Sequence, residues 1–113
     1  MITMEKLKDF GANVEEGLER CMGREDFYLS LVKKAAQDQR LPLLEEQLAA
    51  KDLNAAFETA HALKGIFANL ALEPLTKPVS EMTELLRAGT DTDYSGLLGE
   101  TKAQFEKLNG LQD

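Results

Sequence analysis

The chain of 113 residues contains a single histidine, His61, within the segment Ala60-His61-Ala62-Leu63-Lys64-Gly65. Imidazole is largely neutral at pH 7, and a neutral ring nitrogen is a nucleophile. Lys64 follows three residues later, so on a helix its ammonium would lie near the imidazole. A phosphoryl group on the ring would bring about two negative charges, with which Lys64 can pair. The pattern therefore predicts a histidine that accepts and donates a phosphoryl group.

Gly65 lies one helical turn after His61. A glycine inside a helix costs about 1 kcal/mol relative to alanine, so its presence beside this histidine needs a reason. Ala62 and Ala68 are also small and lie on the same side of a helix. A strip without large side chains would let another protein approach the imidazole closely. We expect this docking surface to contain Glu58, Ala62, Gly65, Ala68 and Asn69.

Helices must position these residues, because helix-forming residues dominate and no alternating run of β-branched residues occurs. Apolar residues at steps of three and four predict helices over 4–10, 14–22, 24–51, 53–71, 73–88 and 94–108. The last four segments predict an all-α fold, an antiparallel up-down four-helix bundle. We expect one domain over 1–113, with 1–23 as a helical lid on the bundle of 24–108.

Prolines and glycines qualify this prediction. Pro42 predicts a kink or a short break in the segment 24–51, and the sequence leaves both open. Pro78 predicts an irregular first turn or a late start for the segment 73–88. Gly96 and Gly99 weaken the first turn of the last helix. In the segment 53–71, His61 lies about 100° from the apolar stripe, at the edge of the buried face.

Composition excludes several classes of protein. The net charge of −7 argues against nucleic-acid binding, because phosphate backbones select basic surfaces. No apolar run approaches the ~20 residues of a membrane span, and the N-terminal residues do not form a signal peptide. The single cysteine, Cys21, cannot form an intramolecular disulfide. We therefore expect a cytoplasmic monomer without a membrane or nucleic-acid partner.

The segment 60–65, followed by Asn69-Leu70, resembles the signature of histidine-containing phosphotransfer (HPt) domains. The segments 27–50 and 75–87 resemble the flanking helices of that family, so the similarity covers roughly residues 7 to 108. The resemblance implies a four-helix bundle with His61 exposed midway along its second helix. It also implies that Lys64 lies near the phosphoryl group and that Gly65 leaves space for a partner domain.

The resemblance further implies a role in a multistep phosphorelay. His61 would accept a phosphoryl group from the aspartyl phosphate of a receiver domain and pass it to the aspartate of another. Response-regulator receiver domains, and a hybrid sensor kinase, would be the partners. The chain would bind no cofactor, because Mg²⁺ would come from the receiver. Without an ATP site it would be a carrier rather than an enzyme.

Three positions depart from the family pattern. Ala71 stands where glycine is common, Phe67 where a small residue is common, and Ala35 where a bulky aromatic is common. Phe67 and Ala35 could be a compensating exchange of size across one helix pair, which would conserve core volume.

Two other functions remain open from the sequence. A helical adaptor could bind a receiver domain or another signalling partner without carrying phosphate, and it would tolerate replacement of His61. A metal-binding bundle is the weaker alternative. Glu58 and His61 lie one turn apart, but no second Glu-x-x-His pair completes a carboxylate-bridged site.

Overall fold

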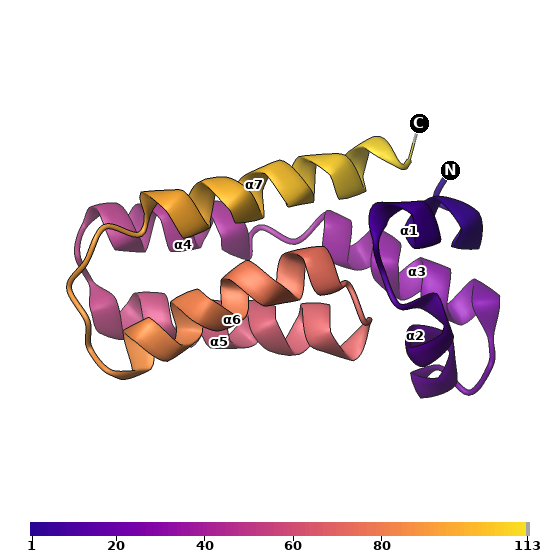
Figure 1. Cartoon of the computed structure of the whole chain (residues 1–113), viewed down its shortest axis with the longest axis horizontal. Coiled ribbons are helices and arrows are strands. Elements are labelled where there is room, and N and C mark those ends of the chain that lie inside the picture. The colour runs from indigo at the N-terminus through magenta and orange to yellow at the C-terminus, as the bar shows by residue number, and fades with distance from the viewer. Residues whose placement is uncertain (113) are drawn as a thin grey trace.

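The computed structural model describes residues 1–112, and the regular elements in that range are helices (Figure 1). Their bounds are α1 Met4–Phe10, α2 Val14–Arg20, α3 Glu25–Ala36, α4 Arg40–Ala49, α5 Leu53–Asn69, α6 Glu73–Arg87 and α7 Ser95–Gly110. Three of the helices begin at a side-chain cap. Thr3 accepts a hydrogen bond from the backbone nitrogen of Lys6, Asn13 from Glu16 and Asp52 from Ala55.

Helices α4 to α7 form the bundle that the sequence predicts. Helix α5 packs against α4 and α6, and α6 also packs against α7. Short connections join these helices, and the chain reverses its direction at each of them (Figure 1). The largest fully buried side chains come from all parts of the chain: Leu7, Tyr28, Val32, Leu44, Leu63, Phe67, Leu72, Leu75, Val79, Met82, Thr83 and Leu108. The structure confirms an all-helical bundle, in which α5 packs between α4 and α6.

The long segment 24–51 is broken rather than kinked. Helix α3 ends at Ala36 and α4 begins at Arg40, so the break precedes Pro42, which lies in the first turn of α4. A proline is tolerated there because the first N–H groups of a helix have no intrahelical acceptor. Of the two alternatives that Pro78 predicted for the segment 73–88, the late start of the helix is wrong. Helix α6 starts at Glu73 with Pro74 in its first turn and continues through the buried Pro78.

The N-terminal helices pack at one end of the bundle (Figure 1). Three donors in the N-terminal part of the chain form hydrogen bonds with backbone carbonyl groups at or just after the C-terminal end of α5. The backbone nitrogen of Asn13 donates to Ala71 (2.9 Å), the Arg20 guanidinium to Ala68 (3.0 Å) and the Tyr28 hydroxyl to Leu70 (2.8 Å). These bonds hold the N-terminal helices against the C-terminal end of α5 and the turn that follows it. Asn13 and Arg20 belong to the segment 1–23, whereas Tyr28 belongs to α3.

The departures from the family pattern have structural consequences. Ala71 has a positive φ of 56°, the left-handed region in which glycine is favoured. The buried Phe67 packs its ring against Phe105 of α7, at 6.4 Å between centroids. Ala35 instead borders a hollow of about 240 Å³ between α3 and α5. Neither observation describes a contact between Phe67 and Ala35, so the exchange of size across this helix pair stays a prediction.

None of the helices described over residues 1–112 is both long enough and apolar enough to cross a membrane.

Candidate functional site

His61 lies near the middle of α5, and its side chain is exposed. Ala60, Leu63 and Phe67 of the same helix are fully buried, as the apolar stripe predicts. The imidazole therefore stands on the edge of the helix that faces away from the core. This placement agrees with the prediction from the helical periodicity.

A strip of small or exposed residues runs along α5 beside the histidine. Glu58, Gly65 and Asn69 are exposed, while Ala62 and Ala68 are half-buried. A Cβ added at Gly65 would meet no atom within 4 Å. Gly65 is thus not required for close packing within the chain, and a larger side chain there would project outward. We call these residues, with His61, the α5 strip.

Phe57 lies one turn before His61 and supports its ring. The two rings are stacked, with 5.7 Å between their centroids and an angle of 23° between their planes. The guanidinium carbon of Arg87 lies 5.1 Å from the centroid of the Phe57 ring, a cation–π contact. Because Arg87 ends α6, this contact brings a second helix beside the histidine.

Lys64 does not stand free beside His61. Its ammonium lies 3.8 Å from a carboxylate oxygen of Glu84 on α6, and Arg87 reaches the same oxygen at 3.4 Å. Lys64 is the least exposed of the three side chains, at 34%, compared with 60% for Glu84 and 52% for Arg87. Lys64, Glu84 and Arg87 therefore form a charged cluster between α5 and α6, in which two cations share one carboxylate.

The sequence did not predict the contacts that Phe57, Glu84 and Arg87 make at this site. The sequence places Phe57 on the apolar stripe and Arg87 at a helix end, where a cation suits the dipole. The spacing of four between Phe57 and His61 is a readable signal of contact on a helix. Nothing in the local pattern indicates that Glu84 and Arg87 face α5, since that depends on how α6 packs.

The surroundings of the α5 strip differ between its C-terminal end and the side that faces α3. At its C-terminal end, Arg20 of α2 binds the Ala68 carbonyl and also pairs with Glu16 at 2.6 Å. On the side of α3, the hollow beside Ala35 is lined by apolar and polar groups: Leu31, Lys34, Ala35, Asp38, Ile66, Asn69 and Leu70. A hollow thus borders the α5 strip on the side of α3, and the Arg20–Glu16 ion pair borders its C-terminal end.

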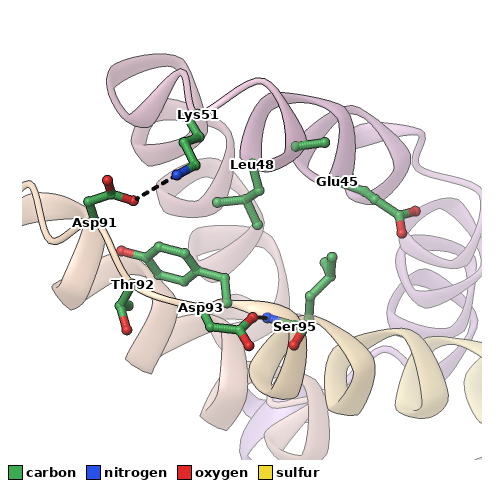
Figure 2. A pocket seen from close by; sticks show the side chains of 10 residues that line it. Glu45, Leu48, Lys51, Asp91, Thr92, Asp93 and Ser95 are labelled. Atoms are coloured by element: carbon green, nitrogen blue, oxygen red, sulfur yellow. Dashed lines mark hydrogen bonds and ion pairs between the residues drawn. The ribbon is translucent and has the colours of Figure 1, made fainter.

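A second hollow, of about 630 Å³, lies where the end of α4 meets the loop before α7 (Figure 2). Its acidic side chains have partners within the chain. Asp91 lies 4.0 Å from the Lys51 ammonium, and Asp93 accepts a hydrogen bond from the backbone nitrogen of Ser95 at 2.9 Å. Hydrogen bonding to the Ser95 side chain, with a smaller contribution from the Ser95 backbone nitrogen, holds the pKa of Asp93 below its usual value. None of the predicted site residues lines this hollow.

The structure offers no grouped metal ligands in the part of the chain that it describes. Over residues 1–112, no three His, Cys, Asp or Glu side chains gather closely enough to hold a metal ion. Glu58 and His61 both lie on the α5 strip, without a third ligand nearby.

Comparison with known proteins gives one clear finding. The family model described as the Hpt domain matches residues 30–110. No curated protein and no solved structure gives a significant match. The matched range contains α4 to α7 and most of α3, and it includes His61, Lys64 and Gly65. The chain therefore belongs to the Hpt domain family, whose members carry phosphoryl groups in phosphorelay signalling and interact with receiver domains and kinases.

Proposed function

We propose that the protein is a phosphorelay intermediate that carries the phosphoryl group on His61. The observation that carries this proposal is the exposed imidazole of His61 beside the open surface at Gly65. A receiver domain must bring its aspartyl phosphate within bonding distance of the ring, and large side chains on the α5 strip would prevent that approach. The proposed donors and acceptors are receiver domains, with a hybrid sensor kinase as a further partner.

The accepting step conserves atoms and charge without a base from this chain. A lone pair on the unprotonated ring nitrogen of His61 attacks the phosphorus of the aspartyl phosphate. The N–P bond forms while the P–O bond breaks, and its electron pair leaves on the aspartate carboxylate. The other ring nitrogen keeps its proton. The donating step runs in reverse toward the aspartate of a second receiver.

Phosphoryl transfer depends mainly on positioning and on neutralising charge. In this proposal Phe57 orients the imidazole through the stacked contact, and Lys64 pairs with the phosphoryl oxygens. The chain itself holds no cofactor, and the receiver supplies Mg²⁺. The proposed setting is the cytoplasm, in keeping with the acidic composition and the single buried Cys21.

The test is a transfer assay with the full chain and a panel of phosphorylated receiver domains. We expect the wild-type protein to gain an acid-labile, base-stable label, and the label to move to a second receiver when one is added. His61→Gln should bind the same receivers and keep the same helical content without gaining the label. Equal labelling of His61→Gln would refute phosphotransfer at this residue. Binding without any label on the wild-type protein would favour the adaptor function instead.

A further inference from the structure

Glu84 occupies a position that the proposed carrier function leaves unexplained. Its carboxylate lies 3.8 Å from the Lys64 ammonium and 3.4 Å from Arg87 Nε. Arg87 also lies over the Phe57 ring, and that ring stacks on His61. Glu84 thus already binds two cations near this site: Lys64, one turn after His61 on α5, and Arg87, which contacts the ring that stacks on His61.

Resting on the proposed phosphotransfer at His61, we propose that Glu84 competes with the phosphoryl group for these cations. In the unphosphorylated protein Glu84 holds Lys64 and Arg87. When His61 carries the phosphoryl group, its oxygens take up one or both cations, and Glu84 is left as a repelling neighbour. Glu84 therefore lowers the fraction of protein that is phosphorylated and makes His61 a better phosphoryl donor.

The direction of this effect follows from charge alone. Removing the carboxylate takes two ion pairs from the unphosphorylated state, and it removes repulsion from the phosphorylated state, which carries about two negative charges. Both changes favour phosphohistidine. The three side chains are between 34% and 60% exposed, so each pairing is weak. We expect a combined shift of about two- to fivefold in the transfer equilibrium.

Glu84→Gln tests the proposal, because it removes the charge and keeps the shape of the side chain. Glu81→Gln is the matched control, since Glu81 is exposed on the same helix, one turn away, and none of the ion pairs described for residues 1–112 involves it. A receiver domain that transfers its label to the wild-type chain is first phosphorylated with acetyl phosphate. Each variant of the whole chain is then equilibrated with this receiver domain. The phosphohistidine fraction is then measured.

A second readout needs no partner protein. Phosphoramidate phosphorylates imidazole directly, with release of ammonia, and ³¹P NMR then follows the second ionisation of the phosphoryl group. We expect Glu84→Gln to lower the pKa of that group and to raise the phosphohistidine fraction two- to fivefold, with both differences shrinking in 1 M salt. Glu81→Gln should match the wild type in both measurements.

The proposal is overturned if Glu84→Gln matches the wild type, lowers the phosphohistidine fraction, or behaves like Glu81→Gln. In the assay with the receiver domain, partial unfolding would lower the phosphohistidine fraction, so a loss of stability would not imitate the expected gain. A wild-type chain that neither the receiver nor phosphoramidate labels would overturn the proposed function itself. Failure of Glu84 alone, with a labelled wild type, concerns only this inference.

Discussion

At the scale of single residues, the candidate site consists of one exposed imidazole and a cluster of charged side chains near it. His61 is exposed, Phe57 stacks on its ring, and Lys64 shares the Glu84 carboxylate with Arg87. Since these ion pairs are open to water, each contributes little to folding. We expect their main effect in the proposed phosphorylated state, in which the local charge would change most.

Substitutions of Lys64 should separate charge from position. Lys64→Ala should lower the transfer rate by up to about tenfold, because an exposed pairing of this kind is worth about 1 kcal/mol or less. Lys64→Glu should lower it further, since a carboxylate repels the donor's phosphoryl group. High salt should narrow the difference between the two variants, because exposed charges are screened within about 10 Å at ~0.1 M salt.

Transfer rates measured over a salt series decide this prediction. Lys77→Ala is a suitable control, because Lys77 is exposed on α6 and none of the ion pairs described for residues 1–112 involves it. Rates equal to those of the wild type in both Lys64 variants would show that this ammonium plays no part in transfer.

At Gly65, the size of the side chain should control access rather than folding. The space around it is open, so Gly65→Gln should fold normally and project toward the partner. We expect slower phosphotransfer with a melting temperature no lower than that of the wild type, because glutamine is a better helix former than glycine. Transfer from receiver domains and labelling by phosphoramidate should be measured together, because the small donor needs no docking surface. Equal slowing with both donors would contradict a docking role for the α5 strip.

At the scale of the elements, two glycines inside helices show opposite surroundings. A Cβ at Gly17 of α2 would lie 2.6 Å from the Tyr28 ring, whereas a Cβ at Gly65 of α5 would meet nothing within 4 Å. Tyr28 is fully buried, and its hydroxyl is bonded to the Leu70 carbonyl. It cannot move aside easily. Glycine is therefore required between α2 and α3 and not required within α5.

The same substitution should thus have opposite effects at the two positions. Gly17→Ala should lower the free energy of unfolding by about 1–3 kcal/mol, because an added methyl group overpacks the contact with Tyr28. Gly65→Ala should raise it by up to about 1 kcal/mol, because alanine is the better helix former. Chemical denaturation of both variants measures these changes. A stable Gly17→Ala protein would show that α2 shifts readily on α3.

At the scale of the whole molecule, Tyr28 joins the N-terminal segment to the bundle. Its hydroxyl donates to the carbonyl of Leu70, immediately after α5, beside the bonds from Asn13 and Arg20. Burial, with a smaller contribution from Cys21, raises the pKa of Tyr28 to about 12. A buried phenol resists ionisation because the charged form is desolvated.

Stability should therefore fall at high pH. The folded pKa of Tyr28 lies above the value near 10 of an unfolded tyrosine, so its contribution is fully present below pH 10 and is lost as the pH rises toward 12. The loss should be on the order of 2 kcal/mol. The free energy of unfolding is measured from pH 8 to 11.5 for the wild type and Tyr28→Phe. The phenylalanine variant should show a flatter profile, and parallel profiles would contradict the assignment.

The sequence alone determined the features that depend on local periodicity and capping. Steps of three and four between apolar residues define the helices and place His61 at the edge of the buried stripe of α5. Asn13 and Asp52 mark helix starts because each side chain accepts a hydrogen bond from the backbone nitrogen three residues later. The motif around His61 also indicated the Hpt family, which the match to residues 30–110 confirms.

Only the tertiary structure decided how these helices face one another. Lys64 pairs with Glu84, 20 positions later in the sequence, and Phe57 contacts Arg87, 30 positions later. Both contacts join α5 to α6. The hollow beside Ala35 and the hydrogen bonds from the N-terminal part of the chain to the end of α5 likewise depend on packing between distant segments. Helical periodicity fixes which face of a helix is buried, but not the rotation and shift of its neighbour, because those follow from side-chain packing across the interface.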